Sequence, residues 1–434
     1  MRVALWILLT LLLFSDGAFA KVYIDINAPG RRRFPIAIAD FINLAGSEDG
    51  QGLAQTISTV LSNDLEIAGL FNILDPRSYI EKASAGELDP TKITFRDWSV
   101  IGAEALVKGA YRTNGNKVEL EARLFDVVEE TMVVGKKYSG PRENLRDMVH
   151  KFANEIMVAF TGEKGIFETQ LTYVSNVTGA KEIYMMDFDG YNSRRITNNR
   201  SINLSPLLSP NGQKLVFTSY KRGVPDLFLI DLKTGLEVKL SITNGIHIAG
   251  SWDPQGDWVA ITASKDGNSD IYLIKPDGRS SRRLTDDWGI DVSPSFSPDG
   301  RQIVFTSNRQ GTPQIYLMNA DGSNVQRLTF EGEYNTSPSW SPRGDRIAFV
   351  SKIEGVFDIM TIKPDGTDLR RLTGGAGNNE NPAWSPNGRY LAFTSSREGR
   401  PAIYLMNEDG LGVRRLTRGP GDYLSPKWAL KSFE

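Results

Sequence analysis

The chain has 434 residues, with 50 Lys and Arg against 52 Asp and Glu and a formal net charge of −2. This balance argues against a dedicated nucleic-acid-binding protein, whose affinity comes from clustered basic side chains. The chain has no Cys and only 2 His. These counts exclude disulfides, thiolate nucleophiles, zinc knuckles and iron–sulfur clusters, and they leave little for acid–base or metal chemistry.

The first twenty residues have the pattern of a secretory signal peptide. Arg2 precedes an apolar run over residues 3–14, and Ala18-Phe19-Ala20 provides the small residues that signal peptidase accepts. The run is shorter than the ~20 residues that a membrane-spanning helix needs. Export without Cys is typical of a bacterial periplasm. We therefore expect cleavage after Ala20 and a periplasmic mature protein with no direct membrane insertion.

Residues 34–165 contain no internal repeat and predict a small α+β domain. Its expected strands cover residues 34–39, 71–74, 103–112, 117–125 and 132–138, and its expected helices begin near residue 53 and at residue 145. Asn114-Gly115 is a hairpin turn signal between two of these strands. A domain of this length can bury its own core.

Residues 166–434 repeat with a period of 44. The hydroxyl residue of a short Arg-Leu-Thr motif, for example, falls at Thr197, Ser241, Thr285, Thr329, Thr373 and Thr417. Each unit contains four short strand patterns separated by turn signals such as Ser-Pro-Asp-Gly. A period of ~40–45 residues with four strands is the signature of a β-propeller.

The phase of the repeat indicates how the ring closes. The first unit starts at Leu171 with a second-strand pattern, and the chain ends just after Trp428 in a first-strand pattern. Residues 171–434 hold six units of this length. We therefore expect a six-bladed propeller whose C-terminal strand completes blade one, which removes exposed sheet edges.

A search for catalytic motifs gives no match. The chain has no Gly-x-Ser-x-Gly elbow, His-Glu-x-x-His, phosphate loop or dinucleotide fingerprint. Its recurring Trp residues are expected to pack blade against blade, and turn chemistry explains the Asp-Gly pairs without calcium. His150 is expected to be a surface or packing residue, and His247 to be a contact residue in a loop. We expect no catalytic residue, no cofactor and no metal site.

These features together resemble the TolB family of the Tol–Pal system. The resemblance rests on the signal pattern, the Cys-free α/β domain and the six units of Ser-Pro-x-Trp-Ser-Pro-Asp-Gly, Ile-Tyr-Leu-Met and Arg-Arg-Leu-Thr motifs. It implies a periplasmic, non-catalytic scaffold that supports outer-membrane integrity and constriction during cell division. The implied partners are the lipoprotein Pal at one mouth of the propeller, the C-terminal domain of TolA at the N-terminal arm, and in some species colicins at the Pal mouth.

The resemblance places the TolA-binding arm at residues 21–33. The arm residues expected to bind are Lys21, Val22, Tyr23, Ile24, Asp25, Ile26, Asn27 and Arg31. The alternation of apolar and polar residues suits addition of a strand to a partner's sheet. It equally suits an ordinary first strand of the α/β domain, and the basic cluster of residues 31–33 does not match the family pattern.

The resemblance places the Pal-binding mouth at the loops that enter the first strand of each blade. The expected contact residues are His247, Ala249, Asp291, Tyr334, Asn335, Asn378, Asn379, Glu380, Asp422 and Tyr423. Polar and aromatic groups on a rigid ring form a preorganised contact surface. Solvated loop residues without a partner are the alternative at each position. A carbohydrate-binding propeller and an exported propeller hydrolase are the alternative functions.

Overall fold

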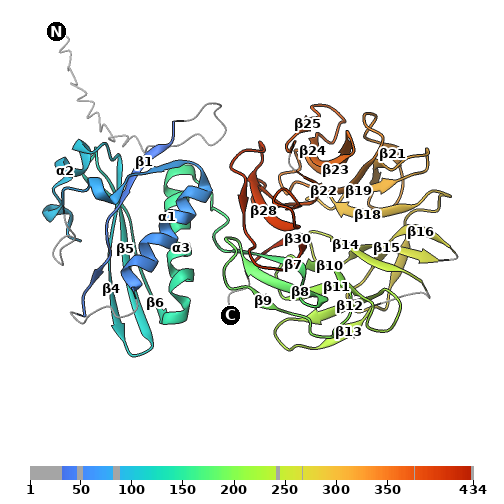
Figure 1. Cartoon of the computed structure of the whole chain (residues 1–434), viewed down its shortest axis with the longest axis horizontal. Coiled ribbons are helices and arrows are strands. Elements are labelled where there is room, and N and C mark those ends of the chain that lie inside the picture. The colour runs from blue at the N-terminus through green and yellow to red at the C-terminus, as the bar shows by residue number, and fades with distance from the viewer. Residues whose placement is uncertain are drawn as a thin grey trace, which may run out of the picture.

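The computed structural model describes residues 32–45, 52–81, 88–240, 245–265, 267–375 and 377–431. An α/β domain and a β-propeller lie side by side (Figure 1). The signal pattern and arm residues 21–31 lie outside the described residues, so the predictions for them stay predictions. Within the described part of the chain, no helix combines the length and the apolar character needed to cross a bilayer.

The α/β domain contains one sheet in the order β3-β1-β4-β5-β6, with β2 paired to β4. Its elements are β1 (Phe34–Ile38), β2 (Ile42–Asn43), α1 (Leu53–Ala68), β3 (Phe71–Ile73), α2 (Phe95–Val100), β4 (Ala105–Asn114), β5 (Lys117–Asp126), β6 (Thr131–Pro141) and α3 (Leu145–Thr161). β1 runs parallel to β3 and β4, whereas β4, β5 and β6 form an antiparallel meander. The predicted strands and helices are confirmed, and β2 and α2 are additional.

Helical periodicity explains how α1 and α3 cover the sheet. α1 buries Ile57, Val60 and Leu61, and α3 buries Phe152 and Ile156, so each helix turns an apolar stripe toward the same core. Both helices end at a glycine with a positive φ, which a side chain would strain. The other face of the sheet packs against a second core over residues 93–98.

Six four-stranded sheets form the propeller, which confirms the predicted fold. Blade 1 contains β7 (Thr169–Thr178), β8 (Ala180–Asp187), β9 (Arg194–Arg195) and the C-terminal β30 (Tyr423–Leu430). Blades 2 and 3 contain β10 (Asn203–Leu208), β11 (Lys214–Ser219), β12 (Asp226–Asp231), β13 (Glu237–Lys239), β14 (His247–Trp252), β15 (Val259–Lys265), β16 (Asn268–Ile274) and β17 (Ser281–Arg283). Blade 4 contains β18 (Asp291–Phe296), β19 (Gln302–Ser307), β20 (Gln314–Asn319) and β21 (Gln326–Arg327). Blades 5 and 6 contain β22 (Asn335–Trp340), β23 (Ile347–Ile353), β24 (Val356–Ile362), β25 (Arg370–Arg371), β26 (Asn379–Trp384), β27 (Tyr390–Ser395), β28 (Ala402–Asn407) and β29 (Arg414–Arg415).

The C-terminal strand closes the ring as predicted. β30 pairs antiparallel with β7, with Tyr423 opposite Ser175 and Trp428 opposite Leu171. Blade 1 therefore takes its innermost strand from the end of the chain and its other three strands from the beginning of the propeller. This arrangement leaves no free edge at the point where the ring starts and ends.

The repeated residues hold the blades together. The Thr of the repeat accepts a hydrogen bond from the backbone N–H of the third strand in five blades, at 2.8–3.0 Å. Trp252 and Trp384 are buried, and the indole N–H of each donates to a backbone carbonyl in the first strand of the preceding blade. The prediction that these tryptophans pack blade against blade is confirmed.

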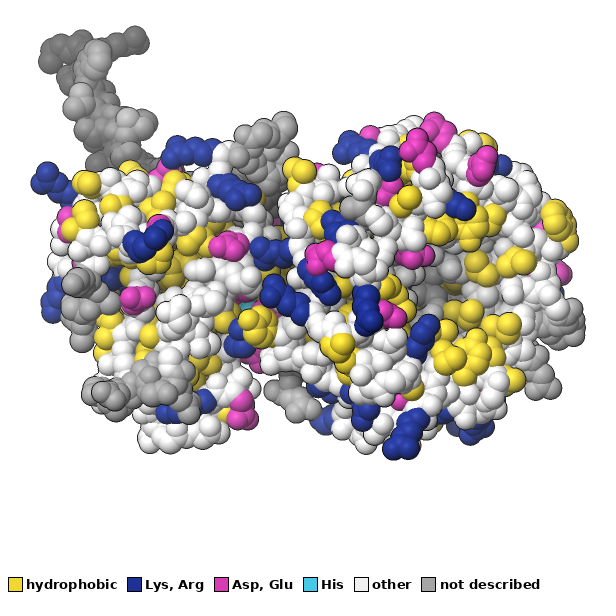
Figure 2. Space-filling model, in the orientation of Figure 1, with side chains coloured by type: hydrophobic (Ala, Val, Ile, Leu, Met, Phe, Trp, Pro, Cys, Tyr) yellow, Lys and Arg dark blue, Asp and Glu magenta, His cyan; other side chains and the backbone are white. Residues whose placement is uncertain are grey.

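The two ends of the propeller have different surroundings. At one end of the propeller lie the turns that join first to second strands and third to fourth strands. We call it the covered end, because the α/β domain packs there on blades 1 and 6. At the covered end Arg389 pairs with Glu163, and Lys431 pairs with Asp147. Figure 2 shows Lys and Arg side chains gathered along this junction. We call the opposite end, where the chain enters each first strand, the open end.

Candidate functional site

Buried polar residues join neighbouring blades near the open end. The first residue of each first strand is Asn203, His247, Asp291, Asn335, Asn379 or Tyr423. All six side chains are buried. All of them except Asn203 are residues that the sequence predicts at the Pal-binding mouth.

The network around Asn379 shows what these residues do. The Asn379 amide, on blade 6, donates to Asp358 Oδ1 on blade 5 at 3.0 Å, and the Thr373 hydroxyl donates to the same oxygen at 2.8 Å. Ser395 in turn donates to Asn379 Oδ1 at 2.8 Å. Blade 5 and blade 4 repeat the arrangement, because Asn335 and Thr329 both donate to Gln314 Oε1. These hydrogen-bonded groups make the blades a rigid support for the open end.

Five of the predicted mouth residues are therefore placed differently from expectation. His247 is the first residue of β14 and is 0% exposed, rather than part of an exposed loop. Burial lowers the pKa of His247, so its imidazole is neutral. The side chains of Asp291, Asn335, Asn379 and Tyr423 are likewise buried. The expectation erred because polar residues at a strand start resemble loop residues in sequence. Their contact with a partner stays a prediction. Because their side chains are buried, they would influence a partner only by positioning the exposed residues of the loops around them.

The other predicted mouth residues differ in exposure. Tyr334 and Asn378 are exposed, and Glu380 and Asp422 are half-buried. Ala249 is the third residue of β14 and is buried, rather than part of an exposed loop. The Tyr334 ring lies against Phe357 with centroids 5.9 Å apart. Burial raises the pKa of Glu380.

Sequence reasoning missed an exposed apolar surface at the open end. Trp288 is 75% exposed and Phe330 is 76% exposed, and both lie in segments that lead into first strands. With Tyr334 they form a surface that we call the aromatic rim, completed by the exposed Ile202, Ile246 and Ile290. The rim follows the entrances to blades 2–5, away from the α/β domain.

The repeat itself contains the signal that would have found the rim. Positions 44 residues apart share a role in blade packing, whereas Trp288 and Phe330 differ from their counterparts. The residues in register with Trp288 are Arg200, Asn244, Gly332, Ala376 and Pro420, and those in register with Phe330 are Asn198, Ile242, Asp286, Gly374 and Arg418. None of these residues is aromatic, so blade packing does not require an aromatic side chain at either position.

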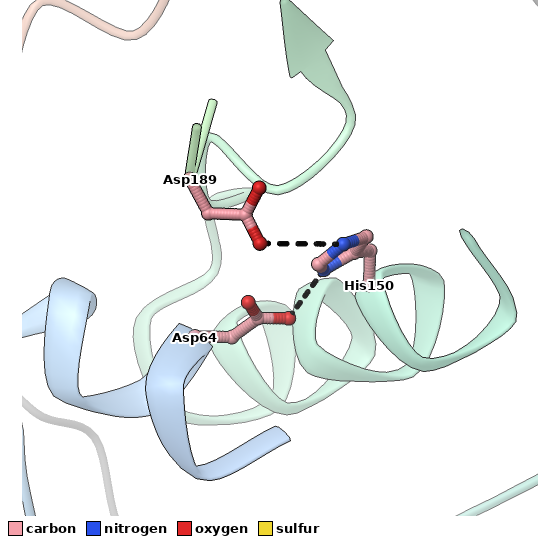
Figure 3. A group of neighbouring side chains, drawn as sticks. All are labelled: Asp64, His150 and Asp189. Carbon is pink, nitrogen blue, oxygen red and sulfur yellow. Dashed lines mark hydrogen bonds and ion pairs between the residues drawn. The ribbon is translucent and has the colours of Figure 1, made fainter. Parts of the chain in front are cut away.

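A buried charged cluster lies where the α/β domain meets the covered end (Figure 3). His150 on α3 is 2% exposed, and its Nδ1 lies 2.7 Å from Asp64 Oδ2 on α1. Its Nε2 lies 3.9 Å from Asp189 Oδ2, in the turn after β8. Arg146 on α3 donates to Asp189, and its guanidinium lies 3.8 Å from the centroid of the Tyr191 ring.

The cluster has the donor types of a metal site but a different arrangement. Among the described residues, Asp64, His150 and Asp189 are the grouping of His and acidic side chains close enough to share an ion. Arg146 already neutralises Asp189, and Asp64 occupies Nδ1 of His150. The residues therefore fit an ion-paired network between two domains better than a ligand set. His150 was expected at the surface or in packing, and it packs in the interior.

Comparison with known proteins agrees with this architecture. Residues 22–133 match the model of the TolB amino-terminal domain, and residues 158–432 match that of the TolB beta propeller domain. The chain belongs to the TolB family.

Relatives and a solved structure support this assignment. The chain is 43% identical over 216 residues to the Tol-Pal system protein TolB of Syntrophotalea carbinolica, covering 50% of each chain. It is 45% identical over 194 residues to that of Geobacter sulfurreducens, covering 45% of this chain and 44% of the relative. The chain thus spans about half the length of the curated relatives that it matches. The crystal structure of TolB from Acinetobacter baumannii is 27% identical, with a TM-score of 0.79 over 92% of this chain and 97% of that one.

Proposed function

We propose that this TolB-family protein is a periplasmic protein–protein interaction scaffold of the Tol–Pal system. In this proposal the open end of the propeller binds the lipoprotein Pal, and the arm of residues 21–33 binds the C-terminal domain of TolA. The scaffold performs no catalysis and supports outer-membrane integrity and constriction during cell division. The observation that supports it most directly is the aromatic rim, an exposed apolar surface that blade packing does not require.

The physical properties of the rim suit a protein partner. Large aromatic side chains bury extensive apolar area on binding at a low entropic cost, and they are enriched among the residues that contribute most to protein interfaces. The Tyr334 hydroxyl belongs to the rim, and the exposed Asn378 lies at the entrance to blade 6, next to the rim-bearing entrance to blade 5, as expected of an interface with a polar periphery. The hydrogen-bonded blade network beneath them keeps the surface preorganised, which lowers the cost of binding.

The arm proposal rests on the sequence of residues 21–33. The match to the TolB amino-terminal domain starts at residue 22. Arg32 is bonded to Glu104 at 2.6 Å, and β1 starts at Phe34. Val22, Ile24 and Ile26 alternate with Tyr23, Asp25 and Asn27, a pattern that would let this segment add to the sheet edge of TolA.

Calorimetric titration of residues 21–434 with the soluble domain of the same organism's Pal tests the proposal. We expect a one-to-one complex that Trp288→Ala and Phe330→Ala each weaken by about 2 kcal/mol, or about thirty-fold in Kd. Leu236→Ala is the control, because Leu236 is an exposed apolar residue in a turn at the covered end. Repeating the titration with residues 34–434 measures whether the arm influences binding at the open end.

Absence of binding to Pal would contradict the proposed partner. If folded protein does not bind Pal, the Pal assignment is wrong for this chain. The exposed aromatic side chains would then favour the carbohydrate-binding alternative, which a glycan array tests directly. Binding that both rim substitutions leave unchanged would keep Pal as the partner but place it elsewhere on the molecule.

A further inference from the structure

The contact between the α/β domain and the propeller has a titratable group at its centre. Phe188 and Phe167 pack there with a ring separation of 5.5 Å, and the His150 ring meets Phe188 edge-on at 5.2 Å. The outer contacts are ion pairs closer to solvent, such as that of Arg389 with the largely exposed Glu163. The buried His150 ring of α3 thus lies against an aromatic ring of the propeller, and its charge state acts on the contact directly.

The protonation state of His150 determines the net charge of the cluster, and with it whether the two domains attract each other at this contact. Asp64 and Asp189 are both carboxylates with fully buried side chains, and Arg146 is the cation that offsets Asp189. With a neutral His150, the cluster carries an excess negative charge, and the Nε2 lone pair faces Asp189. With a protonated His150, the charges balance, and Nε2–H points toward Asp189. Buried charges are tolerated only when they are paired in this way.

Of the two distances from the His150 ring to a carboxylate, only the one to Asp189 of the propeller can shorten. His150 Nδ1 and Asp64 Oδ2 are already within hydrogen-bond distance at 2.7 Å, and both belong to the α/β domain. The 3.9 Å between Nε2 and Asp189 Oδ2 crosses from one domain to the other. An approach of about 1 Å would convert that separation into a charge-assisted hydrogen bond. His150 Nε2 and Asp64 Oδ1 have no hydrogen-bond partner, so both atoms are available for a tighter arrangement.

We propose that Asp64, His150, Asp189 and Arg146 form a proton-operated clamp, which draws the propeller against the α/β domain when His150 is charged and loosens that contact when it is neutral. The expected direction of titration agrees with this proposal. Burial opposes protonation of His150, but the hydrogen bond and charge of Asp64 and the charge of Asp189 outweigh it and raise the pKa of His150. Burial raises the pKa of Asp64 to about 6. Both shifts mean that His150 and Asp64 bind protons more tightly when the two domains are in contact than when they are apart.

The other charged groups at the contact have partners of their own. Lys431 bridges Asp147 of α3 and Asp187 of β8 at 2.7 and 3.1 Å. Burial opposes its charge, but these carboxylates raise the pKa of Lys431, so it stays a cation. On the α1 side, Arg414 reaches Asn63 rather than an acid. A pH response near neutrality is therefore assigned to His150 and Asp64.

Two measurements on residues 21–434 test the clamp. Since the chain has only 2 His, nitrogen-15 histidine NMR gives two titrations, and His247→Gln identifies that of His150. Since it has no Cys, labels at Val128→Cys and Leu236→Cys, both exposed and one on each domain, report the interdomain distance by electron spin resonance. We expect His150 to titrate above 6.5, with a narrow distance distribution below that pH and a broader, longer one above it.

Asp189→Asn is the decisive variant. An amide can still accept the backbone N–H of Tyr191, which Asp189 Oδ1 accepts at 3.2 Å, so the turn should fold. Loss of the charge should lower the His150 pKa and remove the pH response of the distance. Asp64→Asn should weaken the response similarly and serves if Asp189→Asn is unstable. A His150 that titrates below 6.5, or a distance that does not change as His150 titrates, would overturn the proposal.

Discussion

The two ends of the propeller use the same 44-residue repeat in opposite ways. At the covered end, turn residues bind the α/β domain: the Asp189 side chain is buried in the contact, and Arg389 pairs with Glu163 at its edge. At the open end, the connections present Trp288 and Phe330 to solvent. Residues that recur in every blade serve packing and closure at both ends. Residues that break the repeat are the ones to examine for binding.

The largest expected contrast compares one phenylalanine from each end. Phe188 is fully buried between Phe167 and His150, so Phe188→Ala should lower the free energy of unfolding by about 3–5 kcal/mol. Phe330→Ala should change it by no more than about 0.5 kcal/mol, because its side chain is mostly exposed. Urea unfolding followed by fluorescence measures both. Similar costs at the two sites would contradict the distinction between the ends.

A second contrast separates the surface of the open end from its support. Asn379→Ala removes a buried amide that joins Asp358, Ser395 and Arg397, so it should destabilise the chain by about 1–3 kcal/mol. The adjacent Asn378 is exposed, and Asn378→Ala is the matched control with a much smaller expected cost. Thermal unfolding of both variants provides the comparison. A neutral Asn379→Ala would show that the buried network does not support the blades.

The buried Asp64 at the covered end should make the free energy of unfolding depend on pH. Because burial raises the pKa of Asp64 from 3.8 to about 6, the folded chain binds a proton more tightly than the unfolded chain between those values. The free energy of unfolding therefore falls as pH rises through this window, and the raised pKa of His150 extends the fall above pH 6.5. Asp64→Asn should reduce this fall by about 1–3 kcal/mol.

Asp368, a half-buried acid whose pKa shifts in the opposite direction, is the control for that measurement. Hydrogen bonds from Arg370 and Arg346 lower the pKa of Asp368 to about 2. The ionised Asp368 therefore contributes to the free energy of unfolding at neutral pH, and this contribution is lost as pH falls through its pKa in the folded chain. Asp368→Asn should weaken the acid limb of the stability curve and leave the fall near neutrality in place. An unchanged curve for Asp64→Asn, measured by urea unfolding from pH 4 to pH 8, would rule out a titrating contact at the covered end.

The smallest expected effect concerns the margin of the domain contact. Glu163 is 55% exposed and pairs with Arg389 at 2.7 Å. Glu163→Gln should cost no more than about 0.5 kcal/mol, because exposed ion pairs contribute little and salt screens them. Unfolding at low and at 1 M salt measures the difference, which should disappear at high salt. A loss well above 1 kcal/mol would show that this margin, rather than the apolar centre, holds the domains together.

The sequence predicted the architecture because its signals were periodic or local. The 44-residue repeat specified six blades, and the displaced phase at Leu171 and Trp428 specified which strand closes the ring. Apolar spacing specified α1 and α3. The same periodicity would have revealed Trp288 and Phe330 as exceptions, had each position been compared across blades.

The rest depended on pairings that no local pattern encodes. His150 meets Asp64 across 86 residues, and Asn379 meets Asp358 across 21. A polar residue at the beginning of a strand has the same local appearance whether it faces solvent or a partner in the next blade. For this reason the sequence predicts His247 and Asn379 at an accessible mouth, although the structure buries both.

The closing strand has a consequence for how the protein folds. Five blades are contiguous in the chain and can form from local contacts. Blade 1 needs β30, whose Lys427 meets Thr172 of β7 across 255 positions of the chain. Formation of the ring therefore ends with one long-range step, which should be slow relative to the local hairpins. Until that step, the inner edge of β7 is unpaired and can accept the C-terminal strand of another molecule. At high concentration during refolding, the expected by-product is a dimer that has exchanged its last strands.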